Sequence, residues 1–407
     1  MKRIRIGPVL LIAGFVLLVA SYTLLMAYYV QMPGKLEGAD FLTYYSVGRV
    51  ARADGLSRVY DLDLEAAAQA ETAGVPLGTL QILPPNHPPF LYPLLGLLAG
   101  LDYRGAYFGY VLLLVILVAA GLPGLYRALR ENGWPRAPVW VVLVGVLLFE
   151  PFFFSVLKGQ DSAVLLLGGL LWFSGLARND DRLAGLGLSL TLIRPQIAIL
   201  LAAPFLFRRR KVFWWFCVGA LALGAYSLFQ AGWTGAKDYL HILIISAGGT
   251  GYGLAEAAMF NFTGLVLRLA PRLDLGLVHA LGWGLFAAAL VSLCVLWGFS
   301  KTIHYRHIVL AVTLSLFAAP HLHYHDLAML VVPLIGLGLV GVLTGRLTIQ
   351  RAAALPMLVS VVLLFSEWWD PARFTIPYLL MAVLVLLTWL AEKHGAFAFI
   401  AWRHRKG

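Results

Sequence analysis

Charged side chains are scarce in this chain of 407 residues. Lys, Arg, Asp and Glu together make up only 13% of it, whereas about 25% is usual for a soluble domain. Hydrophobic residues make up 60%, and the mean hydropathy is +0.82. So few charges cannot cover a water-exposed surface, and we expect the lipid bilayer to surround much of the chain. This composition excludes an ordinary soluble domain.

Cysteine is nearly absent as well. The two residues present, Cys217 and Cys294, each lie in an apolar run, which excludes a disulfide framework and a thiolate metal site. Gly-rich phosphate loops, dinucleotide fingerprints, nucleophile elbows and the His-Glu-x-x-His zinc signature are missing too. The sequence therefore gives no support for ATP hydrolysis or soluble redox chemistry, and we expect no metal and no cofactor.

The net charge of +11 and the isoelectric point near 9.7 would, taken alone, suggest a nucleic-acid partner. The basic residues instead form short clusters between apolar runs, which is typical of cytoplasmic loops in membrane proteins. We therefore expect no nucleic acid. The clusters are Lys2/Arg3/Arg5, Arg127/Arg130/Arg136, Arg208–Lys211, Lys301/Arg306, Arg346/Arg351 and Arg403/Arg405/Lys406.

Apolar runs of about the length of a transmembrane helix predict an all-α polytopic membrane protein with 10–12 spans. Two further stretches are ambiguous: Pro88–Leu101 is short, and Leu183–Phe207 is interrupted by Arg194-Pro195, where proline removes a backbone donor. The ten runs are Pro8–Val30, Arg104–Tyr126, Pro138–Leu157, Asp161–Ala177, Val212–Ala231, Leu275–Phe299, His307–Ala319, Leu327–Leu343, Ala352–Phe365 and Phe374–Ala391.

The positive-inside rule decides between the two span counts. If both ambiguous stretches crossed, the basic residues around Arg127 and Arg178 would lie outside the cell. We therefore predict ten spans and two re-entrant segments, with twelve spans as the alternative. Broken helices at membrane depth are tolerated only inside protein or along a cavity, so this arrangement already indicates a functional interior.

This topology predicts that residues 1–407 form a single integral membrane domain with both termini in the cytoplasm. We expect it in the cell membrane, which in a bacterium is the inner membrane. The first apolar run is too long for a signal peptide, so we expect an uncleaved span. Residues 31–87 and 232–274 form the long outer loops. In the first loop, Phe41–Asp54 and Asp63–Ala73 are expected to be short helices lying at the membrane surface among the lipids.

Asp40 is the first candidate for chemistry, because its carboxylate follows the first span and is flanked by aromatic residues. Such a group can remove a proton from a hydroxyl nucleophile. The alternative is that Asp40 simply caps the helix that starts at Phe41, since Asp is favoured at that position.

A second cluster holds His321, His323 and His325, followed by Asp326. His321 and His325 are four residues apart and would share one helix face, as a metal pair or as a cationic clamp on a phosphate. Ionisable residues in a membrane interior are functional by default. A polar loop that holds water and backbone is the remaining alternative.

Other polar positions interrupt apolar runs. Asn86 and His87 lie in a rigid Pro-rich turn, while Gln160 and Asn261 lie in polar breaks at the outer ends of spans. Arg194 is isolated in an apolar run, so it needs an anionic partner or a water-filled cavity. A structural partner and a ligand are equally compatible with it.

Taken together and in this order, these blocks resemble glycosyltransferase family 87, the polyprenol-phosphate-mannose-dependent mannosyltransferase type of the GT-C superfamily. The resemblance covers about residues 38 to 335. The motifs are Asp40-Phe41…Tyr44-Tyr45…Gly48-Arg49, Tyr60-Asp61, Pro88-Pro89-Phe90…Tyr92-Pro93, Gly159-Gln160, Ala184-Gly185…Arg194-Pro195, Asn261-Phe262-Thr263-Gly264-Leu265 and Pro320-His321…His325.

The resemblance implies a GT-C-like fold, a mannose donor linked to polyprenyl phosphate as in that type, and a lipid or glycan acceptor at the outer face. It also implies that an acidic residue of the first outer loop is the catalytic base and that metal is not required. Here that base would be Asp40, with His325, or failing that His321, near the donor phosphate. The predicted donor- and acceptor-binding residues are His325, His321, His323, Arg49, Tyr44, Tyr45, Asn86, His87, Gln160, Arg194 and Asn261.

A multi-span transporter or a flippase of lipid-linked glycans is the alternative function. Broken segments with a buried charge, such as Arg194-Pro195, also suit alternating access. No repeat pairs the two halves of the chain, and the polar residues gather on one predicted side. These two observations favour the transferase.

Overall fold

The computed structural model describes residues 6–32, 34–36, 40–77, 82–247 and 256–393. Across these residues the regular elements are helices, with no strand, as the sequence predicted. The α-helices are α1 (Ile6–Gln31), α2 (Phe41–Ala53), α3 (Leu62–Ala73), α4 (Tyr92–Leu98), α5 (Tyr103–Glu131), α6 (Arg136–Leu147), α7 (Glu150–Lys158), α8 (Ser162–Arg178), α9 (Asp181–Leu190), α10 (Pro195–Ala202), α11 (Arg210–Ala247), α12 (Phe262–Leu269), α13 (Leu275–Phe299), α14 (Tyr305–Ala318), α15 (Val331–Leu343), α16 (Ile349–Ser366) and α17 (Asp370–Lys393). The short 3-10 helices are η1 (Leu56–Arg58), η2 (Pro89–Leu91), η3 (Thr191–Ile193), η4 (Ala203–Leu206), η5 (Glu256–Ala258) and η6 (Tyr324–Leu330).

Eight helical segments of the described residues are long and apolar enough to cross a membrane. Large apolar side chains stand exposed on them, such as Phe229 at 83% and Phe299 at 87%, which a lipid environment accommodates and water does not. The chain is thus a multi-pass membrane protein. The eight segments are Leu11–Gln31, Tyr103–Glu131, Arg136–Lys158, Arg210–Ser246, Leu275–Phe299, Tyr324–Leu343, Ile349–Ser366 and Asp370–Leu390.

The number of long segments is smaller than the ten spans predicted. The predicted spans Asp161–Ala177 and His307–Ala319 correspond to α8 and α14, which have 17 and 14 residues. Both fall below the roughly 20 residues that an upright crossing helix needs. Apolar runs in a sequence report burial, and these two helices are buried by protein: most residues of each lie inside the bundle.

The two ambiguous stretches form broken helices. Pro88–Leu101 contains only η2 and α4, and Leu183–Phe207 is divided among α9, η3, α10 and η4. The chain leaves helical geometry at Arg194 (φ −127°, ψ 83°), and Pro195 starts α10, where proline costs no hydrogen bond. A break at the predicted place is therefore present, while its depth in the membrane stays a prediction.

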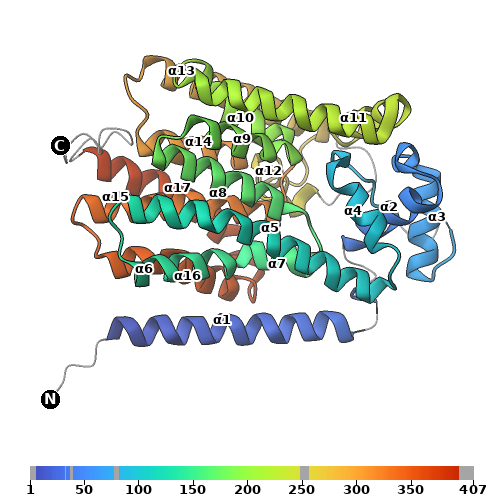
Figure 1. Cartoon of the computed structure of the whole chain (residues 1–407), viewed down its shortest axis with the longest axis horizontal. Helices are drawn as coiled ribbons and strands as arrows, with labels where there is room; N and C mark the ends of the chain where they lie inside the picture. Colours follow the sequence, from blue (N-terminus) through green and yellow to red (C-terminus); the bar gives the residue numbers. More distant parts are fainter. Residues whose placement is uncertain (1–5, 33, 37–39, 78–81, 248–255, 394–407) are drawn as a thin grey trace.

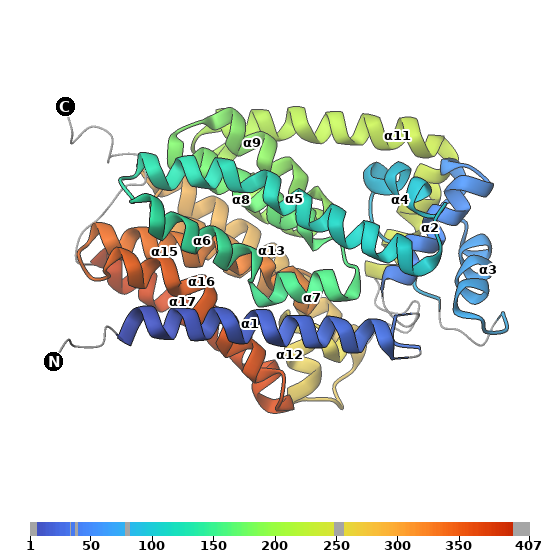
Figure 2. The same cartoon turned by 60° about the horizontal axis from the view of Figure 1, so that its bottom comes forward.

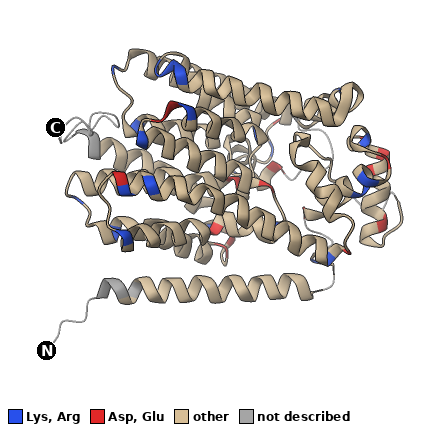
Figure 3. Cartoon of the chain, in the orientation of Figure 1, with Lys and Arg blue, Asp and Glu red and all other residues tan. Residues whose placement is uncertain are grey.

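Both ends of the described chain lie at one end of the bundle. α1 begins there and α17 ends there, whereas α2, α3 and α4 lie at the opposite end (Figure 1). Most Lys and Arg residues of the bundle also gather toward the end where α1 begins (Figure 3). This arrangement agrees with termini on one common side, and the cytoplasmic assignment of that side stays a prediction.

Helix α11 lies across the side of the bundle opposite α1, in both views (Figures 1 and 2). It continues past the predicted end of its span at Ala231, as far as Ala247, with a kink at Gly232. Residues 233–247 of the predicted outer loop 232–274 are therefore helical. The expected short helices of residues 31–87 are present as α2 and α3.

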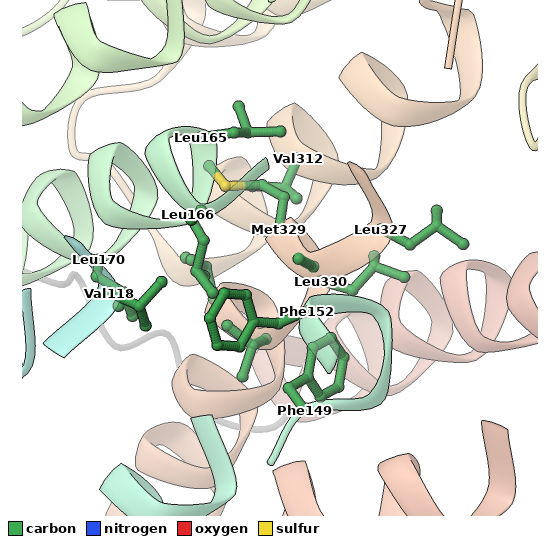
Figure 4. Close-up of a cluster of buried hydrophobic side chains, with 14 of the residues drawn as sticks. Val118, Phe149, Phe152, Leu165, Leu166, Leu170, Val312, Leu327, Met329 and Leu330 are labelled. Atoms are coloured by element: carbon green, nitrogen blue, oxygen red, sulfur yellow. The ribbon is translucent and has the colours of Figure 1, made fainter. Parts of the chain in front are cut away.

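A cluster of buried side chains fixes the position of η6 in the bundle (Figure 4). It includes Phe152 of α7, Leu166 of α8 and Leu330 of η6, each at most 2% exposed. Met329 packs where Gly169 has no side chain, so α8 and η6 approach closely. Because η6 carries His325 and Asp326, this core determines where those two side chains lie.

Candidate functional site

A cavity of about 400 Å³ lies where α2, the 82–88 segment, the end of α7, the break at Arg194, the start of α13 and the His321–Asp326 segment meet. The sequence had singled out nine of the residues that line it. These are Asp40, Tyr44, Asn86, His87, Gln160, Arg194, His321, His323 and His325. Residues from separate parts of the chain thus meet at one place.

Asp40 immediately precedes α2 and occupies the capping position, yet its side chain makes no capping hydrogen bond. Asp61, the equivalent residue before α3, does cap its helix by accepting from the backbone N–H groups of Asp63 and Leu64. The Asp40 carboxylate lines the cavity instead. The capping alternative for Asp40 therefore lacks its defining hydrogen bond.

Tyr44 lies one helical turn after Asp40 and connects α2 to the Pro-rich turn. Its hydroxyl lies 2.8 Å from His87 Nδ1 and donates to Gln160 Oε1 at 3.3 Å. The backbone carbonyl of His87 accepts from the hydroxyls of Tyr60 and Tyr92. Burial lowers the pKa of His87 to about 4, although the nearby carboxylate of Asp161 opposes this shift. The imidazole of His87 is therefore uncharged at pH 7, and it forms part of the cavity wall.

A charge network lies beside this wall. Arg194 Nη1 is 3.0 Å from Asp161 Oδ1, and Arg194 Nε is 3.1 Å from Asp326 Oδ1. All three side chains are at most 6% exposed. Two carboxylates thus neutralise the one guanidinium, so Arg194 has the anionic partners that an isolated cation in an apolar run requires. It is already paired and does not present a free positive charge to a phosphate.

The network has further contacts at both of its ends. Ser162 Oγ donates to Asp326 Oδ1 at 2.7 Å, and His87 Nδ1 lies 3.2 Å from Asp161 Oδ2. The N-terminal residue of α8 and the Pro-rich turn are thereby tied to η6. This network holds together three of the segments that form the cavity.

The histidines of the Pro320–His325 block follow one another along the cavity wall. Ring centroids of His321 and His323 are 4.7 Å apart, and those of His323 and His325 are 5.7 Å apart. Gln196 Nε2 donates to the carbonyl of His321 at 3.1 Å, which fixes the segment against α10. Burial lowers the pKa of His323, and the carboxylates of Asp326 and Asp40 oppose that shift. Asp40 and the histidine segment thus act on one another electrostatically.

The metal-pair alternative for His321 and His325 finds no support in the geometry. Within the described ranges, no group of three or more His, Cys, Asp or Glu side chains is arranged to hold a metal ion. These histidines are suited instead to hydrogen bonding, since a neutral imidazole has one N–H donor and one acceptor nitrogen.

Three predicted residues lie outside this cavity lining. Arg49 forms an ion pair with Glu71 of α3 at 2.8 Å, and Tyr45 donates to the carbonyl of Leu101 at 2.9 Å. Asn261 caps α12 by accepting from Gly264 N–H, and it donates to the carbonyls of Ala319 and Pro320. Its position thus supports the turn before the histidines without facing the cavity.

The predicted set of site residues left out several residues of the lining. Asp161 and Asp326 belong to the same motifs as the predicted Gln160 and His325, and each directly follows one of these two residues. Lys158 lines the cavity and donates from Nζ to the Tyr29 hydroxyl at 2.8 Å. Glu256 and His279, 2.7 Å apart, line another wall, and nothing in their sequence context marked them.

Comparison with known protein families gives a match. The model of glycosyltransferase family 87 matches residues 86–320, more than half of the chain. The matched segment contains the Pro-rich turn, Gln160, Asp161 and Arg194, whereas Asp40 and His321–His325 lie outside it. No curated protein and no solved structure gives a significant match.

Proposed function

The chain belongs to glycosyltransferase family 87, and from this premise we propose that it transfers a sugar, mannose by the resemblance of its motifs, from a polyprenyl-phosphate donor to a lipid or glycan acceptor at the outer face of the membrane. Asp40 acts as the general base. The donor class, the sugar and the base are our proposal, and family membership itself supplies the reaction class.

One observation carries the assignment of the base. The Asp40 carboxylate makes no capping hydrogen bond and lines the cavity beside the histidine segment. A general base has to reach the proton that it removes, either directly or through one water molecule. A carboxylate at a cavity wall that accepts no hydrogen bond from the other described residues meets this condition, because no bond has to be broken before it accepts the proton.

The reaction would be a single displacement with inversion. Asp40 takes the proton of an acceptor hydroxyl while the hydroxyl oxygen forms a bond to the anomeric carbon. The bond from that carbon to the phosphate oxygen breaks, and its electron pair leaves with the polyprenyl phosphate. Donors aimed at this developing charge lower the barrier in a water-poor site.

Lys158 and the histidines are suited to receive the phosphate. Lys158 contacts the hydroxyl and the ring face of Tyr29, and no carboxylate pairs with it among the described residues. His325 and His321 add N–H donors from the opposite segment. Arg194, by contrast, has a positioning role, because its two aspartates already neutralise it.

A donor panel tests this function. Purified protein is incubated with polyprenyl-phosphate sugars, nucleotide sugars and crude lipid acceptors, comparing the wild type with Asp40→Asn. We expect transfer from one polyprenyl-phosphate sugar, an inverted anomeric centre in the product, and loss of nearly all transfer in the variant. Transfer from nucleotide sugars alone, or full activity of Asp40→Asn, would contradict the proposal.

A further inference from the structure

A second cavity, of about 320 Å³, lies between α11 and the segment that contains Pro88–Phe90. Residues of α11 line it at spacings of three and four, which places them on one face of the helix. They are Ala220, Leu223, Gly224, Ser227, Leu228 and Ala231 before the kink, and Ala236, Tyr239 and Leu240 after it. The kink at Gly232 lets this face follow the Pro-rich turn.

The lining of this second cavity is almost entirely apolar. Ser227 is its one polar side chain apart from two tyrosines, and the hydroxyl of Tyr60 is already bonded to the carbonyl of His87. An apolar cavity of about 150 Å³ stays dry and accepts benzene, so this larger one has room for more than one group of that size. Its chemistry suits an aliphatic chain and excludes a sugar or a phosphate.

The second cavity adjoins the main one at two points. Pro195 lines both, and His87 of the main cavity is followed directly by Pro88 of the second. Leu228 and Leu240 are 45% and 57% exposed, and both belong to a helical segment that is long and apolar enough to cross a membrane. A chain lying in the second cavity thus extends from the main cavity toward the membrane.

We propose that this side cavity holds the phosphate-proximal isoprene units of the lipid-linked donor, an assignment that rests on the proposed function. Its position favours the donor over a lipid acceptor. Pro195 is followed by Gln196, whose amide holds the carbonyl of His321. A phosphate bound at the histidine segment would therefore lie near Pro195, which lines both cavities. The chain attached to that phosphate can then occupy the side cavity, which Asp40 does not line.

Two glycines allow a clean test of this assignment. Gly224 lines the side cavity, and a Cβ built there meets no heavy atom within 4 Å. Gly284 of α13 has the same free space but does not line either cavity. The Cβ of Gly224→Phe therefore meets no neighbouring atom, and its ring can fill the side cavity. Gly284→Phe is the matched control, because it adds the same aromatic side chain outside both cavities.

The first measurement compares donors that share a sugar but differ in chain length. With a long-chain donor, we expect Gly224→Phe to lower kcat/KM at least about tenfold, because excluding about two methylene groups from an apolar site costs that much. With a donor truncated to one isoprene unit, we expect Gly224→Phe to lower kcat/KM by a clearly smaller factor. Gly284→Phe should match the wild type with both donors. Equal loss on both donors, or no loss on either, overturns the assignment.

The second measurement needs no turnover, so it separates this inference from the proposed function. A polyprenyl phosphate carrying a photoactivatable group on its phosphate-proximal units is crosslinked to the protein, and the labelled peptides are identified. We expect labelling in the 220–240 region, at least tenfold weaker in Gly224→Phe, unchanged in Gly284→Phe, and displaced by unlabelled polyprenyl phosphate. Labelling that Gly224→Phe leaves intact, or that phospholipid displaces equally well, overturns the assignment even if the enzyme proves active.

Discussion

Arg194 and Asp326 are joined by a two-point contact inside the bundle. Arg194 Nε lies 3.1 Å from one carboxylate oxygen of Asp326 and 3.2 Å from the other. The two residues are 132 positions apart in the sequence, and Asp161 contacts the same guanidinium from a third segment. The broken helix at Arg194, the start of α8 and the histidine segment therefore share one point of attachment.

Removing the cation from this network should destabilise the protein strongly. Arg194→Gln leaves two buried carboxylates without a counter-charge, and breaking a buried pair in this way costs about 3–5 kcal/mol. We expect a large fall in the thermal unfolding midpoint measured in detergent. Arg178→Gln, which breaks the more exposed pair with Glu131, should cost about 1 kcal/mol or less.

A double variant separates the charge imbalance from a loss of packing. In Arg194→Gln/Asp326→Asn one of the two unpaired carboxylates is gone, so we expect stability to recover in part relative to Arg194→Gln. If the double variant were as unstable as the sum of both single variants, the two side chains would not be coupled, and the positioning role of Arg194 would have to be abandoned.

Asp40 and Asp61 should respond in opposite ways to replacement by alanine. Asp61 caps α3 with two hydrogen bonds and pairs with Arg58, so Asp61→Ala should cost about 1 kcal/mol of stability and leave transfer by the folded protein intact. Asp40 makes no such capping bond. Asp40→Ala should therefore unfold near the wild-type temperature and lose transfer.

Thermal unfolding and transfer rates measured on the same samples distinguish the two aspartates. An Asp40→Ala protein that is as destabilised as Asp61→Ala and still active would indicate a capping role after all. The comparison is informative because both residues precede short helices of the same predicted outer loop.

The sequence predicted the helices well where one physical signal dominates. Long apolar runs with few charges predict buried or membrane helices, and the positions of α1, α5, α13 and α17 follow from them. Pro151 could have refined one of these predictions. Its missing N–H and its ring disfavour a continuous helix over Pro138–Leu157, and the structure ends α6 at Leu147 and starts α7 at Glu150.

The site was harder to predict from the sequence than the helices, because its contacts depend on tertiary packing. Arg194 was expected to need an anion, but only the folded chain brings Asp161 and Asp326 to it. The motif that contains Arg49 predicted this residue at the site, but its side chain forms an ion pair with Glu71 of α3 instead. Residue type and order therefore predicted which segments meet, whereas the direction of each side chain followed from how the helices pack.

The stability of the protein should fall as the pH falls below about 6.5. Burial lowers the pKa of His87 from 6.5 to about 4, so between these values the unfolded chain binds a proton that the folded chain does not. Stability linked to His87 is therefore complete above pH 6.5 and is lost progressively toward pH 4. The full effect is on the order of 3 kcal/mol, at about 1.4 kcal/mol for each pKa unit.

Replacing His87 with Gln should flatten this dependence. Half-buried His321 and His323, whose pKa values burial also lowers, keep part of the slope. Unfolding free energies measured from pH 7 to pH 4 should thus show a smaller loss in His87→Gln than in the wild type. His241→Gln, at an exposed position of α11, is the control and should leave the slope unchanged.

Gly159 should be sensitive to a single added methyl group. Its φ of +69° is in the left-handed region, and a Cβ built there lies 2.5 Å from Cβ of Phe41, the first residue of α2. Gly159→Ala therefore has to displace the start of α2, and with it the neighbouring Asp40. We expect transfer to fall at least tenfold, because a small misplacement of a catalytic group is costly.

Gly74 provides the matched control, because its φ is +67° and a Cβ there meets nothing within 4 Å. Gly74→Ala carries only the cost of the left-handed backbone, about 1–2 kcal/mol, at a position that does not line the cavity. Folded Gly74→Ala should retain full transfer, whereas folded Gly159→Ala should show a lower kcat. Equal transfer per folded molecule in the two variants would mean that Gly159 matters for stability alone and that contact with Phe41 does not position Asp40.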